Sequence, residues 1–168
     1  MGKRKKPKME FRYYKMPEGS PILALLGEKW LQSYGRDVDY LHFHNFLEIG
    51  YCYGGQGDMV LGEQNLRFKG NQYSVIPRNY PHTTNSDPGT VSQWEYLFVD
   101  VENFLREHNG GGAAMRTERM IQRINSRAVL VNVKESPRIA RLIRQLLDIM
   151  RETKEYYLEE AKGILVAM

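Results

Sequence analysis

The fold is decided by residues 41–55, which read LHFHNFLEIGYCYGG. His42, His44 and Glu48 share the same parity in this stretch. Because alternate residues of an extended strand point to the same face, a single strand here would present two imidazoles and a carboxylate together. We therefore predict a strand whose polar face points into a barrel or cleft. The positions of opposite parity are apolar and can pack against a covering layer: Phe43, Leu47 and Ile49.

Further along the chain, short runs rich in aromatic and β-branched residues alternate with glycine turns, as in an antiparallel sheet. In the clearest run, residues 92–101, Trp94 and Tyr96 fall on one face and Leu97 on the other. Residues 78–89, RNYPHTTNSDPG, are dense in turn residues, and we expect them to form a loop that brings His82 to the rim. Many short strands without intervening long helices predict a sandwich or barrel of the jelly-roll kind.

These motifs resemble a known family. His42-x-His44-x3-Glu48-x6-Gly55 is similar to the first motif of the cupin superfamily, and Gly70-x6-Pro77-x4-His82 is similar to the second. The second motif has one extra residue after Gly70, and Asn79 stands where a glycine is common. Together with the strand WEYLFVDV from position 94 and two C-terminal helical stretches, the chain from Tyr40 onward resembles the amino-terminal sensor domain of AraC-type transcriptional regulators.

The expected architecture is mainly β, a cupin-like jelly-roll barrel followed by an antiparallel pair of α-helices. We predict a disordered basic tail at 1–10, an effector-binding barrel at 11–135 and a helical dimerisation or linker region at 136–168. Ser136 and Pro137 form a helix start, and apolar residues at helical spacing follow. A second helix is expected from Glu155. The sequence stops within an apolar run at Met168, so we expect a longer protein.

Composition narrows the class of protein. The 168 residues suit one domain, and no apolar run is long enough to span a membrane. The single cysteine, Cys52, sits in an apolar stretch, as expected of a buried thiol in the cytoplasm. The net charge of +4 comes from the tail: removing five basic residues between positions 3 and 8 from the 24 lysines and arginines leaves 19 against 20 acidic residues. The body of the chain is therefore not a DNA-binding surface by composition.

The polar set allows two interpretations. A divalent ion such as Zn, Ni, Fe or Mn could bind the mixed nitrogen and oxygen ligands. Alternatively, the same groups hydrogen-bond to one another without an ion. The AraC-type resemblance implies that no metal is required, whereas the rival hypothesis is a free-standing metal-dependent cupin enzyme, an isomerase or oxygenase. The residues of the possible metal site are His42, His44, Glu48 and His82.

The resemblance also implies partners. A small-molecule effector, such as a sugar or related metabolite, would bind in the barrel, with Trp94 as the ring that stacks on it. The predicted ligand-binding residues are His42, His44, His82, Thr83, Trp94 and Tyr96. The helical pair is expected to form a homodimer through Leu142, Leu146 and Ile149. DNA would be bound only by a helix-turn-helix module beyond Met168, and no membrane partner is expected.

Overall fold

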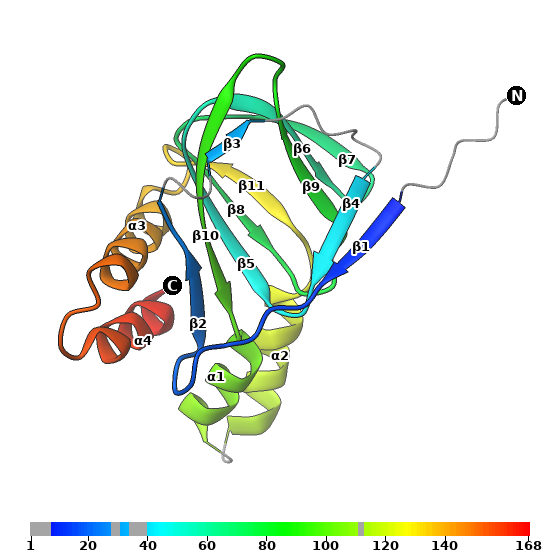
Figure 1. Ribbon diagram of the computed structural model, residues 1–168. Helices are drawn as coiled ribbons and strands as arrows, with labels where there is room; N and C mark the ends of the chain where they lie inside the picture. The colour runs from blue at the N-terminus through cyan, green and yellow to red at the C-terminus, as the bar shows by residue number, and fades with distance from the viewer. Residues whose placement is uncertain (1–7, 28–30, 34–39, 111–112) are drawn as a thin grey trace, which may run out of the picture.

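The computed structural model describes residues 8–27, 31–33, 40–110 and 113–168. Its strands form two sheets that face each other as a barrel (Figure 1). The first sheet has the order β1 (Lys8–Arg12), β4 (Tyr40–His44), β9 (His82–Ser86), β6 (Gln56–Leu61) and β7 (Gln64–Lys69). The second has the order β11 (Val129–Asn132), β8 (Gln72–Ile76), β5 (Leu47–Gly54), β10 (Val91–Val99) and β2 (Ile22–Leu25), and β3 (Leu31–Ser33) also pairs with β10.

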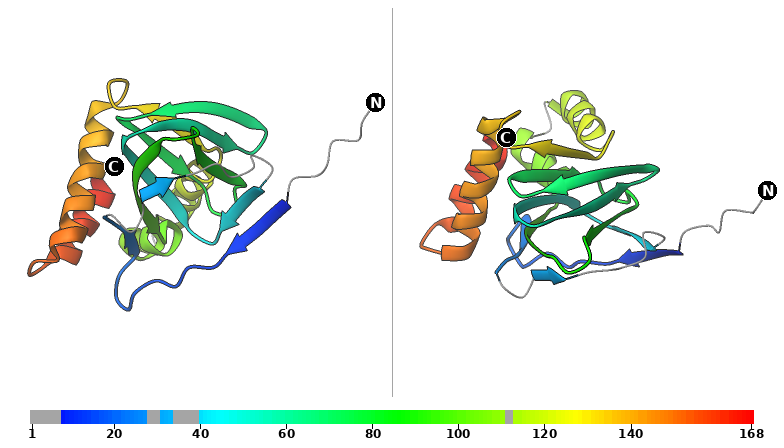
Figure 2. Two further views of the ribbon diagram at one scale, coloured as in Figure 1. Left: turned by 45° about the horizontal axis from the view of Figure 1, so that its top comes forward. Right: turned by 90° about the horizontal axis from the view of Figure 1, so that it is seen from above.

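The described residues also form four helices. They are α1 (Val101–Asn109), α2 (Ala114–Ile124), α3 (Pro137–Glu152) and α4 (Tyr157–Ala167). The pair α3–α4 lies on the side of the barrel away from the N-terminal strand, as both views of Figure 2 show. The prediction of a mainly β barrel followed by C-terminal helices is confirmed. None of the helices in the described part of the chain is both long and apolar enough to cross a membrane.

Two apolar layers follow from the alternation of side chains on the central strand β10. Trp94, Tyr96 and Phe98 point between the sheets, where they pack against Met59 and Phe68 of the opposite sheet. Side chains of the other parity point outward and pack under helices α3 and α4. The predicted division of this strand into two faces is therefore confirmed. The outward layer comprises Leu97 and Val99 of β10 with Ala140, Ile143, Leu146 and Leu147 of α3, all buried.

A buried carboxylate ties α3 to the sheet. Glu95 of β10 accepts hydrogen bonds from the Tyr53 hydroxyl at 2.7 Å, from the Arg151 guanidinium at 2.5 Å and from the Gly27 amide at 2.9 Å. Burial opposes the negative charge, but these donors outweigh it and hold the pKa of Glu95 below its ordinary value. One side chain thus joins the loop after β2, the sheet and the end of α3.

The predicted single strand through His42, His44 and Glu48 is wrong. The chain turns at Asn45 and Phe46, so that β4 belongs to one sheet and β5 to the other. The turn is stabilised by hydrogen bonds that the parity pattern does not reveal: the Asn79 amide donates to the carbonyl of His44 at 2.7 Å. Because the turn takes two residues, the imidazoles and the carboxylate still face the same interior.

Two further expectations need correction. Residues 82–86, predicted as loop, form strand β9, which pairs with both β4 and β6. The predicted tail at 1–10 ends too late, because Lys8–Arg12 forms β1 and pairs in parallel with β4. The remainder of that tail, residues 1–7, lies outside the described residues.

Candidate functional site

Three histidines and one glutamate meet between the sheets near the corner that joins β4 to β5. His42 and His82 are directly paired across β4 and β9, with ring centroids 4.2 Å apart. The ring centroid of His44 lies 4.9 Å from that of His82. Glu48 reaches in from β5, with its Oε2 atom 3.1 Å from His44 Nε2 and 3.5 Å from His82 Nε2. His44, Glu48 and His82 are 0%, 4% and 1% exposed and so are closed to bulk water, whereas His42 is partly exposed.

The backbone fixes which edge of each ring faces the carboxylate. His44 Nδ1 lies 2.8 Å from the carbonyl of Phe46, and His82 Nδ1 lies 2.8 Å from the carbonyl of Tyr80. A carbonyl can only accept, so both Nδ1 atoms must carry the proton. The two Nε2 atoms are therefore left to face Glu48, and His82 Nε2 has no hydrogen-bond partner. An unprotonated Nε2 would repel the carboxylate, so this arrangement suits an added proton or a bound cation between them.

Electrostatics within the cluster differ from group to group. Burial, together with the neighbouring His82, lowers the pKa of His42 to about 2, so His42 is neutral. Burial raises the pKa of Glu48, but His82 and the hydrogen bond from His44 outweigh burial and hold the pKa of its carboxyl below the ordinary value. The site therefore combines a buried carboxylate with a neutral imidazole that has a lone pair to offer.

Three side chains of the cluster could coordinate a metal ion. Donor atoms of His42, Glu48 and His82 lie within 4.8 Å of one another. A ring that donates Nδ1–H to a carbonyl, as His82 does, is the usual form of a metal-binding histidine, and the unpartnered Nε2 of His82 fits the same role. The donor set thus fits a divalent ion. His44, the fourth predicted ligand, hydrogen-bonds to Glu48 instead.

Aromatic side chains form the interior wall beyond the cluster. Trp94 and Tyr96 stack with rings 7° from parallel, and Phe68 meets Trp94 edge-on. The indole Nε1 of Trp94 and the Oγ of Ser74 are buried without hydrogen-bond partners. Buried polar atoms of this kind are normally satisfied by water or a ligand. Ser74 was not anticipated from the sequence, although a serine within the apolar strand 72–76 is a signal that could have pointed to it.

Thr83 lies apart from the other predicted ligand-binding residues. It pairs with Val60 in the register of β9 and β6, whereas its neighbour His82 pairs with Leu61. Adjacent residues of a strand point to opposite faces, so Thr83 is turned away from the histidine cluster. The structure therefore gathers His42, His44 and His82 at one level of the interior, with Trp94 and Tyr96 farther along the wall.

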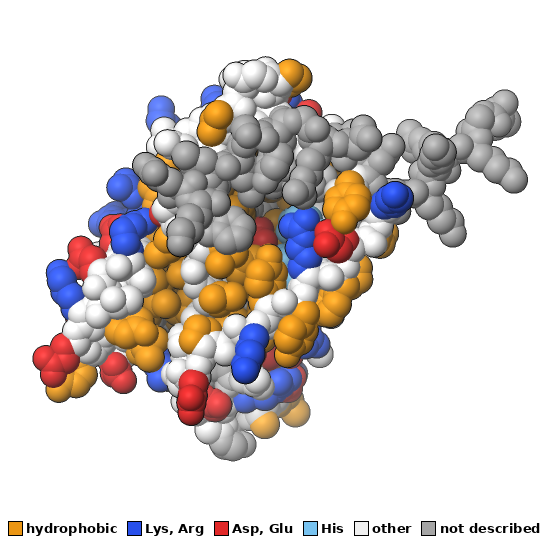
Figure 3. Space-filling model, viewed as in Figure 1, with side chains coloured by type: hydrophobic (Ala, Val, Ile, Leu, Met, Phe, Trp, Pro, Cys, Tyr) orange, Lys and Arg blue, Asp and Glu red, His pale blue; other side chains and the backbone are white. Residues whose placement is uncertain are grey.

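The N-terminal arm covers the cluster. Tyr14 stacks on Phe98 with ring centroids 3.9 Å apart and lies edge-on to His44 at 6.0 Å. The arm is held by Asn45, whose Oδ1 accepts from the Tyr14 amide and whose Nδ2 donates to the Tyr14 carbonyl, both at 2.9 Å. In Figure 3 a histidine side chain is visible only at the bottom of a narrow gap beside the N-terminal strand. No local sequence signal connects Tyr14 to Asn45.

Asn79, which stands where the cupin-like motif usually has glycine, fits its position. Its φ of 58° lies in the left-handed region, which asparagine tolerates better than most residues. The residue donates its amide to the carbonyl of His44, so the loop between β8 and β9 is attached to the corner after β4. The departure from the motif therefore leaves His82 correctly placed beside His44.

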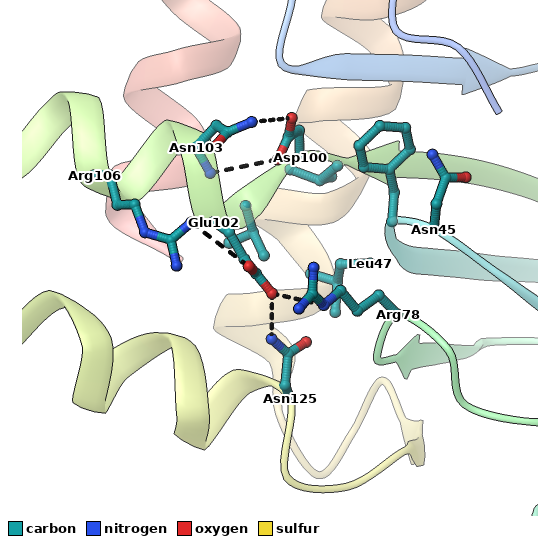
Figure 4. Close-up of a pocket in the computed structure, with 11 residues that line it drawn as sticks. Asn45, Leu47, Arg78, Asp100, Glu102, Asn103, Arg106 and Asn125 are labelled. Carbon is teal, nitrogen blue, oxygen red and sulfur yellow. Dashed lines mark hydrogen bonds and ion pairs between the residues drawn. The ribbon is translucent and has the colours of Figure 1, made fainter. Parts of the chain in front are cut away.

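A separate polar pocket of about 220 Å³ lies where the β4–β5 corner meets α1 and α2 (Figure 4). At its centre Glu102 accepts from Arg78 at 2.8 Å and from Asn125 at 2.9 Å, and Arg106 lies 3.6 Å away. The charged groups of this pocket thus pair with one another. We assign it a structural role, in which it connects the corner to the helices.

The predicted dimer residues differ in exposure. Leu146 is 0% exposed and packs in the core between α3 and the sheet, so it has no surface to offer a second subunit. The expectation for this residue is corrected, because its apolar face is covered by its own sheet. Ile149 is half-buried at the edge of the same core, and Leu142 is half-buried but outside it.

Two packed sheets with a buried polar cluster inside and helices on one outer face define a barrel-shaped binding domain. The chain belongs to the AraC-like ligand binding domain family, whose model matches residues 32–167. This confirms the predicted resemblance to AraC-type sensor domains. No curated protein sequence matches the chain.

Several solved structures have a similar arrangement of elements. ToxT from Vibrio cholerae O395 has 10% identity and a TM-score of 0.44, covering 73% of this chain and 44% of that one. ToxT from Vibrio cholerae strain SCE256 with a bound unsaturated fatty acid has 14% identity and a TM-score of 0.36, covering 54% and 34%. Vicilin from hazelnut, Corylus avellana, has 10% identity and a TM-score of 0.30, covering 53% and 38%. This chain thus spans less than half the length of these structures.

Replacing Asn45 should release the arm. In Asn45→Ala both hydrogen bonds to the Tyr14 backbone are lost, so the Tyr14 amide should exchange with solvent about tenfold faster. Hydrogen exchange followed by NMR measures this directly. Asn132→Ala is the matched control, because that side chain only caps the Lys134 amide at the edge of the other sheet. Unchanged exchange at Tyr14 in Asn45→Ala would show that the arm is held by other contacts.

Proposed function

We propose that the chain is the effector-sensing domain of an AraC-type transcriptional regulator, and that its effector binds inside the barrel beside the histidine cluster. The observation that carries this proposal is the position of Tyr14, which stacks on Phe98 directly over His44. A molecule that enters the barrel beside His44 must contact the arm or displace it. Effector binding and arm position are therefore coupled through the same side chains. The domain itself acts by binding and has no enzymatic step in this proposal.

The unsatisfied polar atoms of the interior favour a ligand with several hydroxyl groups. Trp94 Nε1 is a donor without an acceptor, and Ser74 Oγ is buried without a partner. Sugar hydroxyls can accept from the indole and either donate to or accept from the serine. The stacked faces of Trp94 and Tyr96 supply an apolar surface of the kind that sugar rings pack against. A sugar or a related polyhydroxylated metabolite is thus the effector class that we propose.

Removing the indole donor tests the effector class. A panel of pentoses, hexoses and their acids should contain at least one that binds in calorimetric titration. Trp94→Phe keeps an aromatic ring but loses Nε1–H, so the same sugar should bind about tenfold more weakly. Tyr73→Phe is the control, because Tyr73 faces the helices outside the barrel. Failure of the whole panel to bind, or equal affinity of Trp94→Phe, would contradict a sugar bound at this wall.

A signal from the barrel has a structural route outward through the arm. The arm leads to β2, and the loop after β2 meets Glu95, which also holds Arg151 at the end of α3. A shift of the arm can therefore alter how α3 is held on the sheet. We propose that this change reaches a helix-turn-helix DNA-binding module encoded after Met168. The downstream reading frame tests this step, and a frame without helix-turn-helix units would contradict it.

A second candidate function is that of a metal-dependent enzyme, an isomerase or oxygenase. The unpartnered Nε2 of His82 beside Glu48 favours it. His42, Glu48 and His82 would hold the ion, which would supply a Lewis acid with open positions for substrate. The chain's own residues would orient that ion through the carbonyl of Tyr80, which fixes the His82 ring.

Metal analysis separates the two candidates. As a sensor, the purified protein should carry well under one Zn, Ni, Fe or Mn per chain, and treatment with EDTA should leave its melting temperature unchanged. The measurements are elemental analysis and thermal unfolding, with His82→Ala as the control for site-specific binding. The metal-dependent enzyme would be supported instead by three results: close to one ion per chain in the wild type, loss of that ion in His82→Ala, and a lower melting temperature after EDTA.

We also propose a twofold homodimer through the outer face of α3. Leu142 is the apolar residue of this helix that lies outside the intramolecular core, and Ile149 borders the same face.

Leu142→Glu should convert that dimer to a monomer in light scattering at micromolar concentration, because a charge would be buried without a partner. Gln122→Glu adds the same charge to an exposed position of α2, away from that face, and should leave the dimer intact. A wild-type chain that is already monomeric, or a Leu142→Glu variant that stays dimeric, would contradict this interface.

A further inference from the structure

We propose that a second ligand site lies outside the barrel, between the helical pairs α1–α2 and α3–α4, and that it takes an apolar molecule ending in one carboxylate. A cavity of about 410 Å³ is present there. Its floor is the outward face of the six-stranded sheet, formed by Leu47, Ile49, Val75 and Val99. Figure 1 shows the two helical pairs standing separately against this sheet. The cavity is distinct from the barrel interior, which lies on the opposite face of the same strands.

The walls of the cavity come from both helical pairs. Phe104 of α1 and Ile124 of α2 form one side, and Leu165 of α4 forms the other. Leu165 packs against both the core under α3 and the small cluster around Phe104, as do Val101 and Ile124, so the two cores meet at these residues. The cavity is the part of this junction that the protein's own side chains leave unfilled. Its volume falls within the range of small-molecule sites, about 300–1,000 Å³.

The rim of the cavity carries apolar side chains that a folded protein would normally cover. Met120 of α2 is 37% exposed and Val166 of α4 is 52% exposed, and both line the opening. Exposed apolar side chains gathered around a concave apolar surface mark a binding site. An occupant with an apolar body would cover both residues and fill the space behind them.

One charged side chain lines the cavity, and it determines the polar end of the ligand. Arg123 stands at the C-terminal end of α2 among otherwise apolar lining residues. Within the described parts of the chain no acidic side chain forms an ion pair with Arg123, whereas Arg106 and Arg151 each pair with a carboxylate. A guanidinium binds a carboxylate through two parallel hydrogen bonds. A ligand with a single carboxylate therefore complements the charge of this single unpaired arginine.

Of the two cavities, the apolar one beside Arg123 is better suited to bind a ligand than the polar pocket at Glu102. That pocket is about half the size, and its arginines are already paired with Glu102 and its neighbours. A ligand there would have to break ion pairs, whereas a ligand beside Arg123 would form one. Charge complementarity thus favours the apolar cavity and a carboxylate head.

A ligand in this cavity would touch α2 and α4 at once. An occupant would therefore help to fix the relative position of the two helical pairs. This site can consequently alter the helical face that is proposed to dimerise without involving the barrel. The inference does not depend on the identity of the barrel effector.

Titration with decanoate tests the site. The chain should bind decanoate in one-to-one ratio by calorimetry, below the concentration at which it forms micelles, and should bind decyltrimethylammonium at least tenfold more weakly. Arg123→Gln should weaken decanoate binding about tenfold but leave the binding of decanol unchanged, because only the charged head is affected. Arg119→Gln is the matched control, since Arg119 is an exposed arginine of the same helix that does not line the cavity.

A second variant locates the binding. Val166→Trp fills the rim from a position that is half exposed, so the fold should tolerate it, and it should abolish binding of both decanoate and decanol. Decanoate binding that is equal in wild type, Arg123→Gln and Val166→Trp would place the ligand elsewhere and overturn the proposal. Absence of binding in the wild type would overturn it as well. A dimer that Val166→Trp disrupts and decanoate does not affect would assign the cavity to a second copy of the chain.

Discussion

Two hydrogen bonds from histidine rings to backbone carbonyls set the arrangement on which the rest of the site depends. His44 Nδ1 donates to Phe46 and His82 Nδ1 donates to Tyr80, in each case two residues away along the chain. The carbonyls belong to the turns next to each histidine, so the rings are oriented by the ends of their own strands. Their Nε2 edges are thereby directed at Glu48, from which every proposed role of the cluster follows.

The corner at Asn45 and Phe46 has three functions at once. It passes the chain from one sheet to the other, it supplies the carbonyl that orients His44, and its Asn45 side chain holds the arm through the Tyr14 backbone. The covering arm and the buried cluster are therefore parts of one local structure. A change in either is transmitted over a few ångströms rather than through the whole barrel, which is the physical basis for a sensor at this position.

Much of the fold follows from periodicity, because alternation and helical spacing are local properties. The two faces of β10 and the start of α3 at Pro137 are examples in which the pattern and the structure agree. Pairing between distant segments is not local, so the parallel contact of β1 with β4 and the clamp on Tyr14 left no signal in the sequence. Residue parity does not reveal a corner. The histidines and Glu48 converge as their parity predicts, but they occupy different strands rather than one.

In the candidate site, too, local features could be predicted from the sequence and long-range features could not. The spacing within the two short motifs correctly predicted that four residues lie close together: His42, His44, Glu48 and His82. The apolar stripe of α3 predicted burial but not what would cover it, and Leu146 is covered by its own sheet. The cavity beside Arg123 could not be anticipated, because it arises where helices distant in sequence fail to fill the space between them.

The orientation of the imidazoles is the claim that most needs a direct measurement. Nitrogen-15 NMR of histidine-labelled protein reports which ring nitrogen carries the proton. The account predicts a proton on Nδ1 of both His44 and His82, in the wild type and in Asn45→Ala alike. Rings protonated only on Nε2 would contradict it, because their lone pairs would then face the carbonyls and the Nε2 edges could hold neither a cation nor an incoming ligand's donor.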